Sequence, residues 1–569
     1  MVKYIFSSEN STSQYIKIRV EIPTCENQTN IHLPSWRPGR YELGNFSKNI
    51  KDFKVLDKDR KKIVFEKISK DEWVVDTSLT ELIYVEYMFY ANEMTAGSSF
   101  LTDEQMYVNP VNCAVYTEET KDQEVQLKLV IPEGWIVATS MKKVDESYIV
   151  QNYDELADSP FICSPTLQVR SYEVKGVQFN VWFNGIVKPN WDRLLNDYKS
   201  FTEKQLQKFL EFPTDEFHFL NQIVPYKAYH GVEHQKSTVI VLGPSYDVFG
   251  ELYKELLGVS SHELYHVWNV KSIRPTEMFP YDYKRENYSK LGYLYEGVTT
   301  YMGDVLLYKS GVFTLDQFLV EFTNQFQRHF DNHGRFNYSV AESSFDTWLD
   351  GYQVGAPARK VSIYTEGCLL AFVMDTMILR GTDNQHGLDT VMKRLYFDFY
   401  LKGKGVSEQN LIHVLENVSG VSFDLFFKDY VNGNRPYESI LMDALEYVGI
   451  DLEHSPSKFY SQGRLGMKLI PFRSNFVVKT LYPGGPAELG GIMLEDEIIS
   501  VNNVLLNGEI EKWLEYFNDE LKTFTVKRNG KVLELRIPEV DRNFYMTYSL
   551  KQTQKLTNQQ QKAFEAWKR

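Results

Sequence analysis

The sequence predicts a multidomain α+β protein, and three observations lead to that prediction. The chain has 569 residues, which is too long for a single hydrophobic core. Over the first 170 residues apolar side chains alternate with a period of two, as they do in half-buried strands. The period changes to 3.6 from about residue 247, and short strand-like runs return after about residue 455.

Residues 1–170 are expected to form an N-terminal all-β domain. Its strand-like runs are bounded by Pro, Gly, Asn and Asp, and no long helical pattern interrupts them. The clearest runs are QYIKIRVEIP, DEWVVDTS, LIYVEYMFYA and EVQLKLVIPEGW. This pattern is typical of an antiparallel sandwich or barrel.

Residues 171–454 are expected to form a second domain that is mainly helical. It opens with the strand-like runs VQFNVWFNG and STVIVLGP, which flank the amphipathic helix WDRLLNDYKSFTEKQLQKFLEF. Between about residues 250 and 450 the apolar residues then follow helical spacing. The best examples are DVFGELYKELLGVSSHELYHVWNV, LGYLYEGVTTYMGDVLLYKS and SIYTEGCLLAFVMDTMILRG.

Residues 455–541 are expected to form a C-terminal β domain, followed by a polar tail over 542–569 that ends in a short helix. The run FTVKRNGKVLELRI predicts a hairpin, because Asn529 and Gly530 form a favoured two-residue turn.

Composition excludes several classes of function. The net charge of −14 disfavours nucleic acids and anionic membranes as partners. No run of 18 apolar residues appears, so no membrane span is expected, and without a signal-type apolar block we expect a cytoplasmic protein. The four cysteines include no C-x-x-C pair, which disfavours a thiolate zinc site. The sequence carries no signal for the oligomeric state.

One short motif carries the chemistry. In SSHELYHVWN, His262 and His266 lie four residues apart and Glu263 follows the first histidine. On a helix, two imidazoles at this spacing share a face and can bind one metal ion, while the glutamate between them reaches a water on that ion. The metzincin continuation is absent, because Asn269 and Ser272 stand where that class needs glycine and histidine.

Two glutamates could supply the third metal ligand. Glu286 lies at the shorter spacing, in the charged, non-periodic segment YDYKRENYSK. Glu296 lies inside the predicted helix LGYLYEGVTTYMGDVLL, where Thr299, Thr300 and Gly303 share its face. Small side chains beside a carboxylate leave room for a metal and a substrate, so we favour Glu296.

These motifs resemble a known family. HELYHVWNVKSIRP followed by YEGVTTYMGD is similar to the gluzincin zinc metallopeptidases, specifically to the glycyl aminopeptidase family, and the stretch LPSWRPGRYELGNFSKNI resembles that family's N-terminal signature. The resemblance implies a thermolysin-like catalytic domain with one zinc per chain. It carries over His262, His266 and Glu296 as zinc ligands and Glu263 as general base. On its own, the WRPGRY stretch suggests no chemistry.

The resemblance also implies how the substrate is recognised. AYHGVEHQKST is similar to the family's glycine-rich edge-strand motif, which points to Glu233 and Gly231 as substrate-binding residues. Its glutamate binds a free α-amino group, so the substrate is expected to be a peptide with a free N-terminus, with Gly or Ala preferred in first position. His230 departs from the pattern, since the family has glycine there, and it could narrow the pocket.

A tyrosine is expected to assist at the transition state. VSIYTEGCLL resembles the gluzincin segment that presents a tyrosine to the developing oxyanion, which nominates Tyr364. The family has lysine where this chain has Glu366, which reverses a local charge. The implied mechanism is hydrolysis by a zinc-activated water, with Glu263 transferring the proton to the leaving amine.

The C-terminal segments resemble a PDZ domain, which the family also carries. They are GRLGMKLIP, FVVKTLYPGGPAELGGIMLEDEIISVNN and the hairpin described above. In such domains backbone N–H groups, here near Leu465, Gly466 and Met467, bind a peptide C-terminus by strand addition.

Two other functions remain open from the sequence. One is a zinc endopeptidase with the same metal centre. Glu233 argues against it, because a carboxylate that binds the terminal ammonium would obstruct a substrate that continues beyond its first residue. The other is a non-catalytic peptide-binding scaffold with a structural zinc. Structural zinc sites usually close with four protein ligands, whereas only three are found here.

Overall fold

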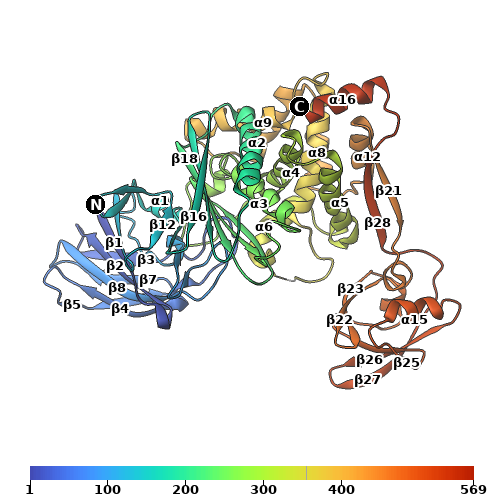
Figure 1. Ribbon diagram of the computed structural model, residues 1–569, viewed down its shortest axis with the longest axis horizontal. Coiled ribbons are helices and arrows are strands. Elements are labelled where there is room, and N and C mark those ends of the chain that lie inside the picture. The colour runs from blue at the N-terminus through green and yellow to red at the C-terminus, as the bar shows by residue number, and fades with distance from the viewer. Residues whose placement is uncertain (354) are drawn as a thin grey trace.

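The chain folds into three units in a bent arrangement, with the middle unit between the N-terminal and the C-terminal one (Figure 1). The computed structural model describes residues 1–353 and 355–569. The multidomain organisation, the all-β N-terminal domain and the helical character of the middle region are confirmed. Among the described residues, no helix is long and apolar enough to cross a membrane.

The N-terminal domain is built from three sheets. An eight-stranded sheet has the order β13-β14-β11-β1-β2-β8-β4-β5, a four-stranded sheet has the order β12-β15-β10-β9, and a three-stranded sheet has the order β3-β7-β6. The elements are β1 (Val2–Asn10), β2 (Tyr15–Pro23), β3 (Gln28–His32), β4 (Ile50–Leu56), β5 (Lys62–Ile63), β6 (Phe65–Ser69), β7 (Glu72–Asp76), β8 (Leu82–Tyr90), β9 (Phe100–Leu101), β10 (Met106–Val108), β11 (Val125–Val130), β12 (Ile136–Thr139), β13 (Lys142–Val144), β14 (Ser147–Val150), α1 (Tyr153–Ala157) and β15 (Phe161–Ser164).

The middle domain begins with a five-stranded sheet of order β16-β17-β18-β20-β19. Strand β19 lies at its edge and pairs antiparallel with β20, which fixes the position of the strand that borders the site. The sheet elements are β16 (Gln168–Val174), β17 (Val177–Asn184), α2 (Trp191–Phe209), β18 (Glu216–Ile223), β19 (Ala228–Glu233) and β20 (Ser237–Gly243).

Helices make up the rest of the middle domain and enclose one large apolar core. They are α3 (Tyr253–Tyr265), the π-helical turn η5 (Tyr293–Val298), α4 (Thr299–Lys309), α5 (Leu315–Asp331), α6 (Val340–Phe345), α7 (Thr347–Asp350), α8 (Ile363–Gly381), α9 (Leu388–Asp398), α10 (Glu408–Ser419), α11 (Asp424–Phe426) and α12 (Glu438–Tyr447).

The N-terminal domain is fastened to the middle domain by a small apolar layer between two sheets. Side chains of the four-stranded sheet, including Tyr107, Ala138 and Ile162, pack against Val232 and Val241 of the five-stranded sheet. Burial of this layer holds the edge strand β19 at the boundary between the two domains. The boundary is therefore placed beside the functional site.

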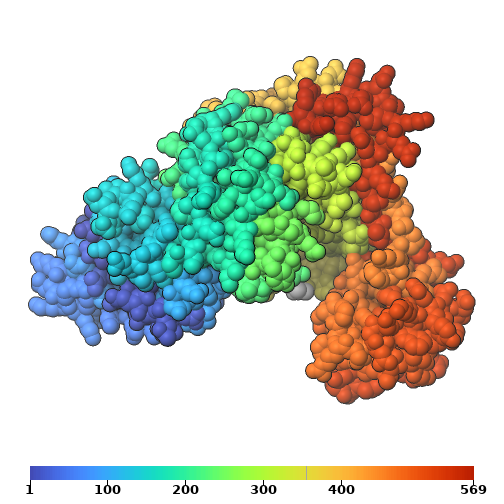
Figure 2. Space-filling view, viewed as in Figure 1, coloured from blue at the N-terminus to red at the C-terminus, as the bar shows by residue number. Residues whose placement is uncertain are grey.

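The C-terminal unit has its own apolar core and projects from the rest of the molecule (Figure 2). Its sheet has the order β22-β23-β24-β26-β27, with β25 paired to β24. Its elements are α13 (Tyr460–Gly463), β22 (Met467–Phe472), β23 (Asn475–Leu481), α14 (Pro486–Leu489), β24 (Glu497–Val501), β25 (Val504–Leu505), α15 (Ile510–Tyr516), β26 (Lys522–Arg528) and β27 (Lys531–Ile537). Asn529 and Gly530 both have positive φ in the predicted hairpin turn.

The loop expected to bind a peptide carboxylate is engaged with its own chain. The N–H groups of Leu465 and Gly466 donate to the carbonyl oxygens of Tyr460 and Gln462 at 3.3 and 3.2 Å. Peptide capture there would require the turn α13 to open. The PDZ-like assignment of this unit stays a prediction.

The segment predicted as a polar tail returns to the middle domain. Strand β28 (Met546–Gln552) pairs with β21 (Ile450–Pro456), and α16 (Asn558–Lys568) ends near the C-terminus against the helical core (Figure 1). Trp567 is fully buried there and donates from Nε1 to the Tyr301 hydroxyl at 2.8 Å. The polar composition of the segment did not predict this contact, because only Ala563, Phe564 and Trp567 of the helix face the core.

Candidate active site

Helix α3 presents the two motif histidines on one face. His262 lies in its last turn and His266 is its C-terminal cap. Their Nε2 atoms are 3.0 Å apart, and the His266 side chain is almost completely buried. The spacing of four residues produces this convergence directly, as expected for a helix.

Asn269 fixes the orientation of His266. Its carbonyl oxygen lies 2.5 Å from His266 Nδ1, so that nitrogen donates a hydrogen bond to it and Nε2 faces His262. The Asn269 side chain donates from Nδ2 to the Leu294 carbonyl and to the Thr299 hydroxyl, which ties the end of α3 to η5 and α4. The sequence reasoning missed this role, although the residue stands directly after the motif.

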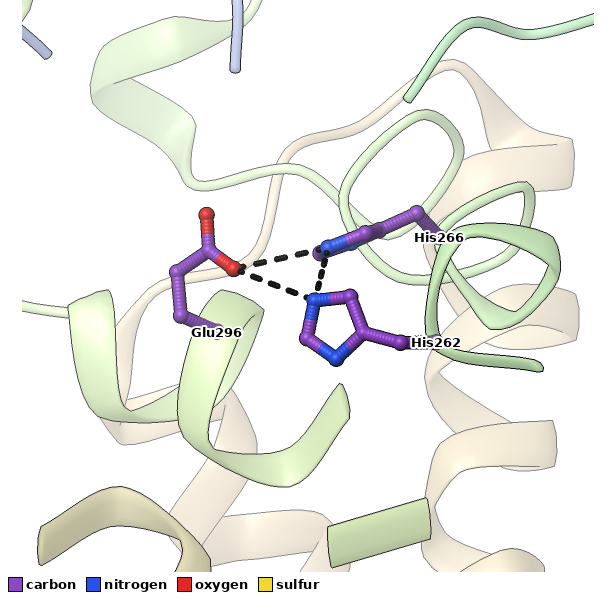
Figure 3. A group of neighbouring side chains, drawn as sticks. All are labelled: His262, His266 and Glu296. Atoms are coloured by element: carbon purple, nitrogen blue, oxygen red, sulfur yellow. Dashed lines mark hydrogen bonds and ion pairs between the residues drawn. The ribbon is translucent and has the colours of Figure 1, made fainter. Parts of the chain in front are cut away.

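Glu296 is brought to the two histidines by the π-helical turn η5, where the sequence predicted an ordinary helix. Its Oε2 atom lies 3.4 Å from His266 Nε2 and 3.8 Å from His262 Nε2 (Figure 3). Single π-turns often occur at functional sites, because they re-aim one side chain within a helix. Glu286 lies in the preceding loop and does not line the cleft.

The three side chains fit a metal ion. Ligand atoms placed about 2.0–2.1 Å from a tetrahedral ion are about 3.3 Å from one another, and the observed separations of 3.0, 3.4 and 3.8 Å surround that value. Two imidazole nitrogens and one carboxylate oxygen are also ligands that Zn²⁺ accepts at catalytic sites. His262, His266 and Glu296 would therefore hold the ion.

The charges of the three side chains favour binding of a cation between them. Burial opposes ionisation of Glu296, but His266 and His262 outweigh it and lower the pKa of Glu296 to about 2. Burial likewise opposes protonation of His266, yet the Glu296 carboxylate raises the pKa of His266 to about 10. The carboxylate is thus ionised at neutral pH and draws positive charge to the point where the three side chains meet.

Glu263 lies against the edge strand β19. A Cβ atom added to Gly231 would lie 2.1 Å from Glu263 Oε1, so only glycine lets the strand pass this close. Glu263 is 5% exposed, and its Oε2 has no hydrogen-bond partner among the described residues. Burial, with Glu233 and Glu296 adding to it, raises the pKa of Glu263 well above its ordinary value. A carboxylate of this kind suits a general base.

Glu233 ends the edge strand and faces the same point. One oxygen of Glu233, one oxygen of Glu263 and one nitrogen of His266 all lie within 4.8 Å of one another. Glu233 is 4% exposed, and its Oε1 has no partner in the part of the chain that the structure describes. The structure therefore brings Glu233, Gly231 and Glu263 together.

Tyr364 lies in the first turn of α8 and borders the same cleft. Burial raises the pKa of its hydroxyl well above the ordinary value, and Glu296 and Tyr352 act in the same direction. The hydroxyl therefore keeps its proton over the working pH range and can donate a hydrogen bond.

Two departures from the family pattern do not alter the centre of the site. His230 borders the cleft beside Gly231, and its Nδ1 accepts a hydrogen bond from the Ala96 N–H at 3.2 Å. Burial lowers its pKa to about 3, so the ring is neutral at physiological pH. Glu366 is buried away from the cleft, where its carboxylate pairs with His329 Nδ1 at 2.8 Å.

The small residues beside Glu296 differ from expectation. Only Thr300 lines the cleft. Gly303 instead allows α4 to cross α3 closely, since an added Cβ would lie 3.0 Å from His262 Cα. Thr299 accepts the hydrogen bond from Asn269. Gly303 and Thr299 therefore contribute to helix packing and position the metal ligands. They do not provide space for a substrate.

The site opens into a cleft of about 610 Å³. Gly39 of the N-terminal domain stands at one end beside Glu233, while α5 contributes Glu321 and Arg328 farther along. The full lining is Gly39, Tyr229, His230, Gly231, Glu233, Lys254, Glu255, Gly258, Val259, His262, Glu263, His266, Glu296, Thr300, Asp304, Phe313, Glu321, Asn324, Gln325, Arg328 and Tyr364.

Fold and site together define a metallopeptidase, and two comparisons with known families specify it further. Residues 3–165 match the Peptidase M61 N-terminal domain, and residues 255–370 match the M61 glycyl aminopeptidase. Over these two segments the chain thus matches the N-terminal and the catalytic domain of the M61 glycyl aminopeptidases.

One solved structure shares the fold over the whole chain. The crystal structure of an aminopeptidase N family protein from Idiomarina loihiensis is 24% identical, with a TM-score of 0.92 and all of both chains covered. An M1 zinc metallopeptidase from Deinococcus radiodurans is 11% identical, with a TM-score of 0.46 over 76% of this chain and 94% of that one. A comparison with curated proteins finds no match.

Proposed function

We propose that the protein is a zinc aminopeptidase that hydrolyses the N-terminal residue from peptides, with Gly or Ala favoured in first position as in the family it resembles. The observation that carries this proposal is the position of Glu233. Its carboxylate lies within 4.8 Å of ligand atoms on Glu263 and His266. One residue of an extended chain spans about 3.3–3.6 Å, so a substrate whose first carbonyl lies at the metal places its free amine at Glu233.

In this proposal, metal binding and proton transfer are carried out by different residues. A divalent ion held by His262, His266 and Glu296 would supply a Lewis acid that lowers the pKa of a water and polarises the scissile carbonyl. Glu263 accepts a proton at its carboxylate and returns it to the leaving amine.

Two further groups bind the substrate in this proposal. The Tyr364 hydroxyl donates to the oxygen of the scissile carbonyl as negative charge develops on it. Glu233 holds the substrate ammonium by a charge-assisted hydrogen bond, which selects peptides with a free N-terminus.

Glu233→Gln is expected to separate amine recognition from hydrolysis. The isosteric amide loses the ionic hydrogen bond, so KM for alanine p-nitroanilide should rise by roughly tenfold or more, with kcat much less affected. The measurement is steady-state kinetics on the free and the N-acetylated anilide, with metal content determined in parallel. The wild-type protein should cleave only the free amine.

Other outcomes would favour the alternatives. Cleavage of the N-acetylated anilide by the wild-type protein would indicate an endopeptidase and remove Glu233 from its role. One metal per chain without hydrolysis of any peptide would indicate a binding scaffold.

The choice of third ligand has its own test. Glu296→Gln should lower zinc affinity by at least about tenfold, because an amide is a much poorer ligand than a carboxylate. Glu286→Gln is the matched control and should keep one zinc per chain, measured by elemental analysis after dialysis against a zinc buffer. Loss of zinc from the Glu286 variant alone would reverse the assignment.

A further inference from the structure

The loop over residues 36–41 of the N-terminal domain belongs structurally to the catalytic centre. Trp36 and Tyr41 are buried in the core of the middle domain, and the N-terminal core lies elsewhere. Trp36 donates from Nε1 to the Asp282 carbonyl at 2.7 Å, and the Tyr41 N–H donates to the Tyr352 hydroxyl at 3.2 Å. Both ends of the loop are therefore held by the domain that carries the metal ligands.

The tip of this loop contacts the carboxylate of Glu233. Gly39 has φ of +79°, and an added Cβ would lie 2.6 Å from Glu233 Oε2 and 3.0 Å from Oε1. No side chain larger than hydrogen fits there without moving the carboxylate. Gly39 is also the one residue of the N-terminal domain that lines the cleft described above. The loop closes the cleft where the amine of a substrate would end.

Arg37 lies two residues before Gly39 in the same loop. Its side chain is 5% exposed, and among the described residues no carboxylate lies within ion-pair distance of it. Burial lowers the pKa of the guanidinium, the neighbouring Arg40 lowers it further, and the Glu233 carboxylate acts against both. A buried cation is costly unless a negative charge compensates it, and the Glu233 carboxylate supplies such a charge.

A second loop of the N-terminal domain supports the first. A Cβ atom added to Gly97 would lie 2.0 Å from Arg37 Cζ, so the guanidinium packs flat on that glycine. Asn112 Nδ2 donates to the Gly97 carbonyl at 2.8 Å, and the neighbouring Ala96 N–H is bonded to His230 of the edge strand. The Arg37 guanidinium thus packs on this second loop, which is itself hydrogen-bonded to the strand that ends in Glu233.

We propose that the loop over residues 36–41 is the amino-terminal wall of the substrate site, in which Gly39 and Arg37 position the Glu233 carboxylate so that a single residue fits between it and the metal ligands. This inference rests on the proposed aminopeptidase function. Gly39 and Arg37 are positioning residues that act through Glu233. The wall restricts the enzyme to substrates with a free amine, because an acyl group on that amine would have to occupy the position of Gly39.

Gly39→Ala tests the wall, with Gly134→Ala as the matched control. Both glycines lie in the N-terminal domain at positive φ, +79° and +84°, but a Cβ at Gly134 meets nothing within 4 Å. Both variants carry the same backbone strain and should melt a few degrees below the wild type. Only Gly39→Ala should weaken binding of L-alaninamide to the zinc-loaded protein, by at least about tenfold in calorimetry.

Kinetics with alanine p-nitroanilide and its N-acetyl derivative complete the test. The wall predicts a higher KM for the free amine in Gly39→Ala, unchanged kinetics in Gly134→Ala, and no cleavage of the acetylated substrate by the wild type. Equal behaviour of the two variants would overturn the inference while leaving the aminopeptidase intact. Cleavage of the acetylated substrate by the wild type would overturn both.

Gly97→Ala provides a second variant without positive-φ strain. Its methyl group would displace the Arg37 guanidinium, and alaninamide binding should weaken by at least about threefold. If alaninamide binds Gly97→Ala and Gly39→Ala as tightly as it binds the wild type, the loop has no part in amine recognition.

Discussion

Glu263→Gln is expected to lower kcat/KM for alanine p-nitroanilide by about 10² to 10⁴-fold, the range typical for loss of a general base. The change preserves shape and removes only the ability to accept a proton. Glu263 is not one of the three side chains that fit the metal, so the variant should keep one zinc per chain and bind alaninamide normally.

The physical reason for so large an effect is the isolation of Glu263. Its Oε2 is buried and without a partner among the described residues, and Gly231 presses β19 against the other oxygen. Burial raises its pKa, which makes the carboxylate a stronger base than an exposed glutamate. Among the described residues, every other carboxylate grouped with the metal-binding side chains already has a proposed role, Glu296 as a ligand and Glu233 as the amine anchor.

Glu251→Gln is a suitable control for this prediction. Glu251 is exposed just before α3 begins and does not line the cleft, so its loss should leave kcat/KM within about twofold. If Glu263→Gln retained more than a tenth of the wild-type kcat/KM with zinc bound, the proton would have to be accepted elsewhere and the proposed mechanism would fail.

The sequence predicts those parts of the site that depend on local spacing. His262 and His266 converge because both lie at the end of one helix, and that geometry follows from 3.6 residues per turn. The all-β character of the first domain follows equally from its period-two pattern. Glu296 could be ranked above Glu286 because its surroundings are periodic, although the π-turn that aims it leaves no mark in the pattern.

The features that the sequence misses depend on contacts between distant segments. Gly39 is nearly 200 residues from Glu233, and the WRPGRY stretch gave no sign by itself that it borders the site. The burial of Trp567 likewise depends on a return of the chain across the helical core. Glu366 suggested a reversed charge near the site, but its partner His329 could be identified only from the fold. Periodicity reports which face is buried, and it carries no information on the partner.

The second large effect is expected at the boundary between the two domains. Asp158→Asn should lower the stability of the folded enzyme by about 3–5 kcal/mol, the usual cost of breaking a buried ion pair. Asp158 Oδ1 lies 2.8 Å from Lys271 Nζ and 3.0 Å from His234 Nδ1, and Oδ2 accepts from the Gln235 N–H at 2.8 Å. Lys271 is 3% exposed, so the variant leaves its charge buried and unpaired.

Calorimetry measures this loss, with Lys236→Met as the matched control. Lys236 forms an ion pair with Glu155 at the same boundary, but its side chain is 35% exposed, whereas Lys271 is almost fully buried. Its removal should cost less than about 1 kcal/mol. The Asp158 variant should melt roughly 10 °C below the wild type. Equal melting temperatures for the two variants would mean that the buried pair does not stabilise the boundary.

The stabilisation by Asp158 should also depend on pH with a definite sign. Burial opposes its ionisation, but Lys271 and His234 outweigh burial and hold the pKa of Asp158 well below its ordinary value of about 4. A depressed pKa stabilises the folded state at pH values above the unfolded value, and this contribution is lost as the pH falls through the folded value. The difference in melting temperature between the wild type and Asp158→Asn should therefore be constant from pH 8 to about pH 5 and shrink below about pH 4.

Stability and substrate recognition are linked at this point, because His234 and Gln235 directly follow Glu233 in the turn between β19 and β20. The three hydrogen bonds from this turn and from Lys271 fix Glu233 relative to the N-terminal domain, which carries both Asp158 and Gly39. Asp158→Asn should accordingly raise KM for the free anilide at temperatures well below melting, with a smaller change in kcat. A variant that loses stability while keeping its KM would show that the Gly39 contact alone holds the amine anchor in place.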